Sequence, residues 1–486
     1  MLARAITHAL VGLEPRRVEV EADVRNGAPA FVIVGLPDRA CAEARQRVRS
    51  GITSAELEFP RGRVTVNLAP AGLRKEGSGY DLPIALAVLA ASRQVPHDEL
   101  DLHASVGELA LDGRLRRVGG ILAVAEGALR MGLERVLCPS ESAAEAALAG
   151  VEPVGFRHLA DTVAYLRGEL EAEPVPPPRG SGDRVRAPDL SDVRGQERAR
   201  RALEIAAAGR HNLLLAGPPG TGKTMLARRL PGILPPLDRD AALEVTRIHS
   251  VAGLLPAEQP LLEQPPFRAP HHSASVAAIV GGGAGIRPGE ASLAHRGVLL
   301  LDELAEFARP ALEGLRQPLE DGVVSIARAA GRAIFPARFQ LVATMNLCPC
   351  GARGDPAAQC TCSAQRLASY RDKLSRALLD RFDLVVAMPR PRATELAAGP
   401  SEPTAPVAER VAAALESRES PAPRRTGDAD ALLSRAVERL PLSGRGRARV
   451  ARVSCTIARL ATSERVEAEH VAEALAYRSP AELAAQ

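Results

Sequence analysis

The sequence predicts an α/β fold with a parallel sheet at its centre. Two short apolar runs, Asn212–Ala216 and Gly297–Leu301, have the length and composition of fully buried strands. Helical and strand patterns alternate around them over residues 189–390, as in a parallel α/β domain. Residues 427–478 instead predict three helices. Apolar residues of the middle helix fall on one face, namely Val450, Val453, Ile457 and Leu460.

Two proline-rich segments divide the chain. Residues 173–188 contain three consecutive prolines and a Gly-Ser-Gly, which predicts an interdomain linker. Residues 391–426 are rich in Pro, Ala and Glu and predict a connector with one short helix at Val407–Glu416. We therefore expect three domains: an N-terminal α+β domain at 1–172, an α/β core at 189–390 and a helical lid at 427–486.

Within the N-terminal domain, alternation of apolar and polar residues predicts strands at Val18–Val24 and Arg63–Leu68. A longer apolar run predicts a helix at Asp81–Ser92.

The composition excludes some classes of protein. The net charge of +4 is too small to indicate nucleic acid by itself, and the absence of tryptophan disfavours an extended base-stacking surface. The longest apolar run, Leu82–Ala91, has half the length that a membrane span needs. Glu14 and several arginines follow a very short apolar start, unlike a signal peptide. We expect a cytoplasmic protein without a membrane partner.

A glycine-rich turn follows the first buried run and precedes a helix predicted at Met225–Leu230. It matches G-x-x-x-x-G-K-[ST] with Gly217, Pro218, Pro219, Gly220, Thr221, Gly222, Lys223 and Thr224. Glycines let backbone N–H groups close around phosphates, and the helix N-terminus adds a positive dipole. The pattern predicts an ATP site in which Lys223 reaches the β and γ phosphates and the Thr224 hydroxyl binds Mg²⁺.

The second buried run ends in two carboxylates, Asp302 and Glu303. Paired with the glycine-rich turn, Asp302 is expected to hold Mg²⁺ through water and Glu303 to polarise the attacking water. A third strand, Phe339–Thr344, leads to Asn346, whose amide could orient that water. A turn-forming asparagine is the alternative interpretation.

Arg381 comes shortly after Leu378 and Leu379 and directly before Phe382. These three apolar residues are expected to be buried. An arginine at the edge of such a domain is usually a surface ion-pair residue. In this context we favour a finger that a subunit supplies to its neighbour's ATP, which requires an oligomer.

Four cysteines form a cluster in a turn-rich segment: Cys348, Cys350, Cys360 and Cys362. Four thiolates could surround one structural, tetrahedral Zn²⁺. The alternative is four reduced thiols in a compact loop. A catalytic metal is not expected, because four cysteines leave no open position.

The chain resembles the ComM (YifB) family of magnesium-chelatase-like AAA+ ATPases over nearly its whole length. Besides the ATP motifs, the resemblance is carried by five segments: Phe31–Pro37, Val66–Pro70, Phe267–His272, Arg287–His295 and Met345–Gly351. It implies an AAA+ P-loop core with a C-terminal helical lid, and a ring, expected to be a hexamer, that uses ATP to move DNA. The family's best-known role is branch migration during natural transformation.

The resemblance also implies that Arg381 is the finger and Arg445 the sensor-2 arginine. Leu347 stands where the family usually has proline. Gly446 and Arg447 replace bulkier residues, which leaves Arg449 as the alternative to Arg445.

The N-terminal domain resembles the Lon protease fold. Gly79 occupies the expected serine position, one residue after Ser78, and Leu122 the expected lysine position. A Ser/Lys dyad needs both groups. We therefore expect a non-proteolytic binding or assembly domain.

Two insertions are candidates for DNA contact. Residues 267–290 include Arg268, His271, His272 and Arg287, and residues 323–338 predict a hairpin with Arg328 and Arg332 near its tip. Positive charge and reach suffice for phosphate contact. Three alternatives to a DNA motor remain from the sequence: a chelatase motor, an ATP-dependent protease and a protein-remodelling motor.

Overall fold

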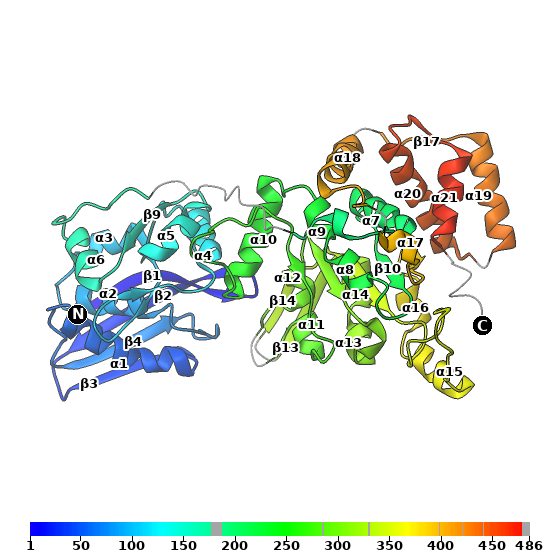
Figure 1. Cartoon of the computed structure of the whole chain (residues 1–486). Helices are drawn as coiled ribbons and strands as arrows, with labels where there is room; N and C mark the ends of the chain where they lie inside the picture. The colour runs from blue at the N-terminus through cyan, green and yellow to red at the C-terminus, as the bar shows by residue number, and fades with distance from the viewer. Residues whose placement is uncertain are drawn as a thin grey trace.

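The computed structural model describes residues 1–175, 187–283, 286–328, 331–397, 399–419, 421–440 and 442–478. Most of the expected linker at 173–188 therefore lies outside the described residues. The molecule is elongated, with the N-terminal domain at one end, the core in the middle and the helical C-terminal part at the other end (Figure 1). The predicted α/β fold is confirmed.

The N-terminal domain is built on one mixed sheet of seven strands, in the order β3-β4-β2-β1-β5-β8-β9. These strands are β1 (Leu2–Val11), β2 (Glu14–Arg25), β3 (Ala30–Val34), β4 (Arg63–Ala69), β5 (His103–Ser105), β8 (Arg135–Pro139) and β9 (Glu152–Phe156). A short ribbon adds β6 (Glu108–Leu109) and β7 (Leu115–Arg116). Both strands predicted for this domain are present, as β4 and as part of β2.

Helices cover this sheet: α1 (Arg39–Ser54), α2 (Asp81–Ala91), α3 (His97–Asp101), α4 (Ile121–Arg130), α5 (Ser140–Ala147) and α6 (Leu159–Leu166). Every residue of α2 is buried, which explains why the helix is apolar on all sides. The predicted helix at Asp81–Ser92 is confirmed to within one residue.

The core contains a five-stranded sheet in the order β11-β12-β15-β10-β16, and all of its strands are parallel. The strands are β10 (Leu213–Ala216), β11 (Phe267–Arg268), β12 (Val298–Leu301), β15 (Gln340–Met345) and β16 (Leu384–Ala387). All residues of β10 and β12 are buried, as in central strands of a parallel sheet.

The core helices are η1 (Leu190–Asp192), α7 (Glu197–Gly209), α8 (Lys223–Ala227), α9 (Leu230–Ile233), α10 (Arg239–Val251), α11 (Val276–Val280), α12 (Glu290–Leu293), η2 (Leu304–Glu306), α13 (Arg309–Gly314), α14 (Arg316–Asp321), α15 (Ala364–Asp372) and α16 (Arg376–Leu379). The predicted helix at Met225–Leu230 is wrong in its bounds, because α8 begins at Lys223 and ends at Ala227. The helix stops just before Arg229, whose side chain turns inward. Arg229 Nε donates to the Asp189 carbonyl at 2.6 Å. Pro231 then stands in the first turn of α9, which begins at Leu230.

The C-terminal part contains α17 (Ala393–Ala397), α18 (Thr404–Glu416), η3 (Ser417–Glu419), β17 (Arg424–Arg425), α19 (Gly427–Arg439), α20 (Gly444–Leu460), β18 (Arg465–Val466) and α21 (Ala468–Ala476). The three predicted lid helices are present, and Val450, Val453 and Ile457 of α20 are buried. The connector holds more structure than predicted, because α17 and three further residues of α18 are helical. Arg410 of α18 reaches back to Glu204 of α7 at 2.6 Å.

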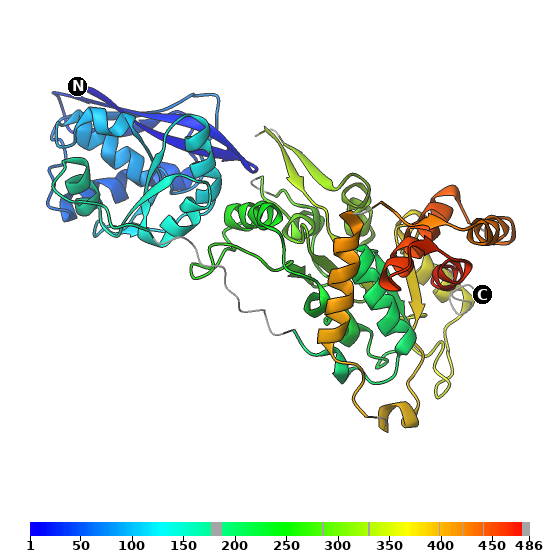
Figure 2. The same cartoon turned by 90° about the horizontal axis from the view of Figure 1, so that it is seen from above.

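Helix α10 joins the core to the N-terminal domain, where it lies against α4 (Figures 1 and 2). The Gly120 backbone N–H donates to the Ser250 carbonyl at 3.1 Å, and the Ser250 hydroxyl donates to Glu145. Leu122 is fully buried in a small apolar cluster with Ala242 and Leu261 of the core. The residue at the expected lysine position of a Lon-type dyad is therefore packed into this junction.

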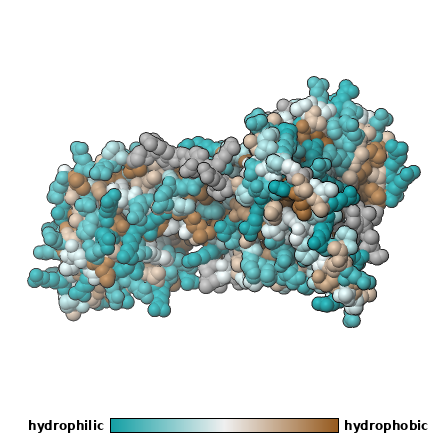
Figure 3. Space-filling model, in the orientation of Figure 1, coloured by the Kyte–Doolittle hydropathy of each residue, from teal (hydrophilic) through white to brown (hydrophobic). Residues whose placement is uncertain are grey.

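Hydrophilic side chains dominate the face of the molecule shown in Figure 3, where apolar residues form only small separate groups. Across the described ranges, each helix is too short or too polar to cross a lipid bilayer.

Candidate functional site

Three parallel strands end side by side at one edge of the core sheet. The register pairs Ala216 with Met345 and Leu301 with Ala343. The residues that follow these strands therefore lie close together and line a cavity of about 290 Å³ with Lys223, Thr224, Asp302, Glu303 and Asn346. The sequence motifs predicted this meeting of side chains at the carboxyl edge.

The glycine-rich loop has room for phosphates. Gly220 and Gly222 have φ angles of 77° and 89°, and a Cβ on either would point into open space. A Cβ on Gly217 would lie 2.2 Å from the Met388 carbonyl oxygen, so this position accepts only glycine. Loop N–H groups that open onto a cavity beside a lysine fit the triphosphate of ATP.

The Lys223 ammonium is held inside the loop. Its Nζ donates to the carbonyls of Gly217 at 2.8 Å and Pro218 at 2.7 Å, and to Asn346 Oδ1 at 3.2 Å. Burial lowers the pKa of Lys223. The contact with Asn346 brings together two of the residues that the sequence placed in the site.

Asp302 is the centre of the candidate Mg²⁺ site. Its Oδ1 accepts from the Thr224 hydroxyl at 2.8 Å and from the Thr344 hydroxyl at 2.6 Å. A carboxylate beside a loop hydroxyl at the mouth of a phosphate cavity is a donor set that suits Mg²⁺ with bound water. Thr224 and Asp302 therefore fit the ion that the motifs predict.

Glu303 adopts a left-handed backbone conformation with φ 58° at the end of β12. Its N–H donates to Thr344 Oγ1 at 3.0 Å, which fixes the turn. The carboxyl group opens onto the same cavity as Lys223. Non-glycine residues in this conformation cost free energy and are concentrated at functional sites.

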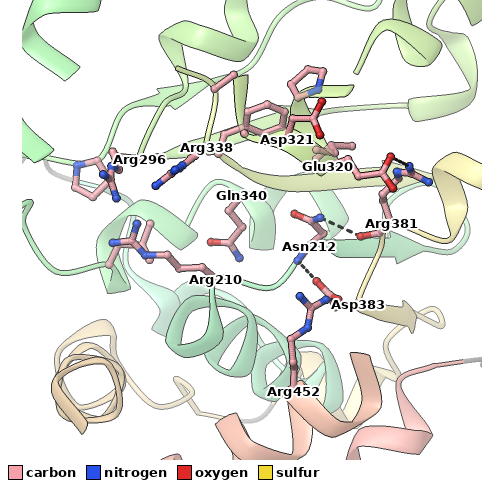
Figure 4. A pocket seen from close by; sticks show the side chains of 18 of the residues that line it. Arg210, Asn212, Arg296, Glu320, Asp321, Arg338, Gln340, Arg381, Asp383 and Arg452 are labelled. Carbon is pink, nitrogen blue, oxygen red and sulfur yellow. Dashed lines mark hydrogen bonds and ion pairs between the residues drawn. The ribbon is translucent and has the colours of Figure 1, made fainter. Parts of the chain in front are cut away.

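Arg381 lies at the opposite edge of the sheet. It lines a cavity of about 580 Å³ together with Asn212, Gly297 and Gln340, which stand at the amino ends of β10, β12 and β15 (Figure 4). A strand of four residues at about 3.3 Å each separates the two edges by about 13 Å. Arg381 therefore cannot touch a phosphate bound in the glycine-rich loop of its own chain.

This second cavity, here called the arginine cavity, has an excess of positive charge. Its charged lining consists of Arg210, Arg296, Arg338, Arg381, Arg449, Arg452, Glu320, Asp321 and Asp383. Buried Arg381 Nε and Arg449 Nη1 have no hydrogen-bond partner among the described residues. Such groups favour an incoming anion.

The two alternatives for sensor 2 both lie on this side of the sheet. Arg449 lines the arginine cavity, and its Nε is 3.5 Å from Asp383. Arg445 is exposed, and its Nη2 lies 3.0 Å from Glu320 Oε1. Neither arginine lines the nucleotide cavity of its own chain.

Family models and known proteins match nearly the whole chain. Residues 189–396 match the family model "Magnesium chelatase, subunit ChlI", residues 401–478 match its C-terminal model, and residues 20–142 match "Subunit ChlI of Mg-chelatase". The protein Rv2897c of Mycobacterium tuberculosis is 46% identical, over 98% of each chain. The protein YifB of Escherichia coli is 42% identical, over 97% of this chain and 96% of its own. "Competence protein ComM" of Haemophilus influenzae is 42% identical, over 98% and 97%.

The chain belongs to the ComM/YifB family of magnesium-chelatase-like AAA+ proteins. The resemblance inferred from the sequence motifs is thus confirmed, and the core is an AAA+ domain.

The four cysteines of this family member come together after β15. Sγ–Sγ distances are 3.3 Å for Cys348 and Cys350, and 3.7 Å from Cys360 to each of these. All four Sγ atoms, including that of Cys362, lie within 4.8 Å of one another. Around a tetrahedral Zn²⁺ with Zn–S bonds of about 2.3 Å, sulfurs are about 3.8 Å apart. The arrangement fits one zinc ion.

The cysteine loop also supports the phosphate loop. A Cβ on Gly351, whose φ is 79°, would lie 2.8 Å from Pro219 Cγ. The Tyr370 hydroxyl donates to the Asn346 carbonyl at 3.2 Å. The first contact packs the cysteine loop against the phosphate loop, and the second holds the backbone of Asn346 against α15.

The predicted hairpin is present, as β13 (Val323–Arg328) and β14 (Gly331–Pro336). Arg332 is exposed, whereas the Arg328 side chain lies outside the described residues. In the other insertion Arg287 is exposed and His271 stacks on His272 at 4.0 Å. Arg268 binds Glu290 through two hydrogen bonds of 2.6 and 2.8 Å, so its charge is already neutralised.

Sequence reasoning missed three residues of these sites. The Thr344 hydroxyl donates to Asp302 and accepts from the Glu303 N–H. The sequence could have indicated this residue as a threonine near the end of an apolar strand. Asp383 Oδ2 accepts from the Asn212 N–H at 3.0 Å and Glu320 pairs with Arg381 at 2.7 Å. No motif marked Asp383 or Glu320, because only the fold brings them to the arginine cavity.

The first prediction concerns Glu303. Glu303→Gln should bind ATP and hydrolyse it about 10² to 10⁴ times more slowly, because an amide cannot accept the proton of water. Steady-state ATPase and nucleotide-binding assays measure both properties. Glu306→Gln is the matched control, since this exposed carboxylate pairs with Lys373. Turnover near the wild-type rate in Glu303→Gln would remove Glu303 from the proposed role.

The second prediction concerns the cysteines. Protein purified under reducing conditions without added metal should contain about one zinc per chain by elemental analysis. Cys360→Ser should lose the metal, whereas Cys455→Ser, outside the cluster, should keep it. A zinc content near zero in the wild-type protein would leave the thiols without a metal role.

Proposed function

We propose that this protein is an ATP-driven ring motor that acts on DNA, with branch migration in recombination or natural transformation as its role. The observation that carries the proposal is the division of the catalytic groups. Lys223, Thr224, Asp302 and Glu303 lie at one edge of the sheet, and Arg381 lies at the other. A complete site then forms only between two chains, which a closed ring, here a homo-hexamer, provides for every subunit.

Each group has a distinct part in hydrolysis. The loop N–H groups and Lys223 bind the phosphates, and Thr224 with Asp302 holds Mg²⁺, which neutralises phosphate charge when bound. Glu303 takes a proton from the attacking water, which Asn346 orients. Arg381 of the neighbouring chain stabilises the charge that develops on the γ-phosphate.

Arg445 is proposed as the sensor-2 arginine, supplied to the same neighbouring site. Glu320 connects Arg445 with Arg381, so both guanidinium groups are presented from one surface. Arg449 is the less suitable group, because it meets Asp383 and not Glu320, the carboxylate that pairs with Arg381.

DNA as the substrate is supported by the exposed arginines of the two insertions and by one relative. Arg332 lies on the hairpin and Arg287 follows the glycine-rich turn, and both side chains are exposed where they could meet phosphates. The relative of Haemophilus influenzae is named a competence protein.

A motor without a DNA substrate is the second candidate, since the net charge is only +4. An ATP-dependent protease is disfavoured by the N-terminal domain. Ser78 donates to Glu108, and the buried Leu122 occupies the place of a catalytic lysine.

The third prediction tests the substrate. ATPase rates should rise several-fold with forked or single-stranded DNA, and Arg332→Ala should weaken this stimulation and reduce its salt dependence. Arg439→Ala, which replaces an exposed arginine at the end of α19, should behave as the wild type. If the protein hydrolyses ATP at one rate with single-stranded, duplex, forked and no DNA, the remodelling motor becomes the better account.

A further inference from the structure

One carboxylate binds both arginines that are proposed to reach the neighbouring site. Glu320, on α14, accepts from Arg381 Nη2 through Oε2 at 2.7 Å. Its other oxygen, Oε1, lies 3.0 Å from Arg445 Nη2. The contact with Arg381 is seen at the rim of the arginine cavity (Figure 4). Glu320 thus joins the AAA+ core to the first turn of α20 in the lid.

The hydrogen bond to Glu320 occupies only one of the N–H groups of the Arg381 guanidinium. An arginine has five N–H donors, of which Nη1 binds the Ala377 carbonyl at 2.8 Å and Nη2 binds Glu320. Nη1 and Nη2 each keep a second N–H. Glu320 can therefore fix the orientation of the side chain while these two N–H groups stay available for a phosphate oxygen.

Arg445 depends on Glu320 more strongly. Its side chain is 67% exposed, and Glu320 is the ion-pair partner that the described residues offer it. A long exposed side chain without such a partner samples many rotamers, and ordering it costs free energy. Glu320 reduces this cost before a neighbouring subunit arrives.

Glu320 is also tied to the hairpin. The next residue but one, Gly322, ends α14 in a left-handed conformation with φ 70°, and β13 begins at Val323. The Gly322 N–H donates to the Pro318 carbonyl at 2.9 Å, and its carbonyl accepts from the Ala337 N–H at 2.8 Å. A Cβ on Gly322 would lie 2.8 Å from Arg338 Cγ. Because this link is short and closely packed, a movement of the hairpin base would also move the end of α14.

We infer that Glu320 is a positioning residue that couples the β13–β14 hairpin to Arg381 and Arg445. The inference rests on the proposed function, in which the hairpin meets DNA and the arginines act on the neighbour's ATP. When DNA displaces the hairpin, the end of α14 moves, and Glu320 carries both guanidinium groups with it. Stimulation of hydrolysis by DNA then passes through this carboxylate.

The fourth prediction compares Glu320→Ala and Glu320→Gln with the wild type. Both variants should keep the KM for ATP within about twofold, because Glu320 does not line the nucleotide cavity. Their kcat should fall about tenfold through misplaced arginines. The ratio of rates with and without forked DNA should fall to about one. Glu320→Gln keeps the size of the side chain, so it still tests the coupling if Glu320→Ala does not fold.

Glu438→Gln is the control, since this exposed carboxylate near the end of α19 lines neither cavity and forms no ion pair within the described residues. It should keep the wild-type kcat and stimulation ratio. A folded Glu320→Gln with the wild-type stimulation ratio overturns the coupling while leaving the DNA motor intact, whatever its kcat. If the wild type itself shows no stimulation, the proposed function fails, and the coupling fails with it.

Discussion

Asp302 Oδ1 accepts hydrogen bonds from Thr224 at 2.8 Å and from Thr344 at 2.6 Å, and these two contacts join three segments of the core. Thr224 lies in the first turn of α8, Asp302 follows β12, and Thr344 lies near the end of β15. Hydrogen bonds to a charged group contribute about 1.5–3 kcal/mol each, so these two contacts stabilise the half-buried Asp302 carboxylate. The parallel register of β10, β15 and β12 places these side chains at one edge. Every catalytic assignment at the nucleotide site depends on that register.

The same parallel sheet separates the two halves of the proposed catalytic site. Lys223 and Glu303 follow the carboxyl ends of strands, whereas Arg381 precedes the amino end of β16. About 13 Å of strand lies between the edges. In the proposed ring, this separation makes assembly a requirement for catalysis. In a single chain, the arginine cavity is open at the surface. Two buried arginine nitrogens at this cavity, Arg381 Nε and Arg449 Nη1, have no hydrogen-bond partner within the described part of the chain, which is costly in a single chain.

Packed contacts also connect the nucleotide core with the N-terminal domain. Ser250 on α10 binds Gly120 and Glu145, and the adjacent His249 Nε2 lies 2.9 Å from the carbonyl of Leu293, next to β12. The turn between β1 and β2 meets the hairpin, where a Cβ on Gly12 would lie 2.6 Å from that of Ala333. The N-terminal domain thus contacts both α10 and the hairpin. This placement suits an assembly or guiding domain better than an independent peptidase.

Local patterns were enough to predict the nucleotide site, because its residues follow buried strands and a glycine-rich loop that are contiguous in sequence. Lys223, Asp302, Glu303 and Asn346 all line or adjoin one cavity as expected. The helix after the loop was predicted to begin and end too late, at Met225–Leu230 instead of Lys223–Ala227, and the inward turn of Arg229 at its end is a tertiary contact. Glu320 and Asp383 could not be found, because their arginine partners Arg381, Arg445 and Arg452 lie 61 or more residues away in sequence. The spacing of the cysteines in the sequence predicted the cluster. Only the fold shows that Gly351, in the same loop, lies against Pro219.

The central claim is that one active site is shared by two chains, and mixing two inactive variants tests it most directly. Rings of Arg381→Ala alone and of Lys223→Ala alone contain no site with both groups intact. A mixed ring contains interfaces where an intact Arg381 meets an intact Lys223, so ATPase activity should reappear on mixing and be greatest near equal proportions. Subunit exchange is confirmed with fluorescently labelled chains. No recovered activity at any ratio, with exchange shown, would contradict the shared site.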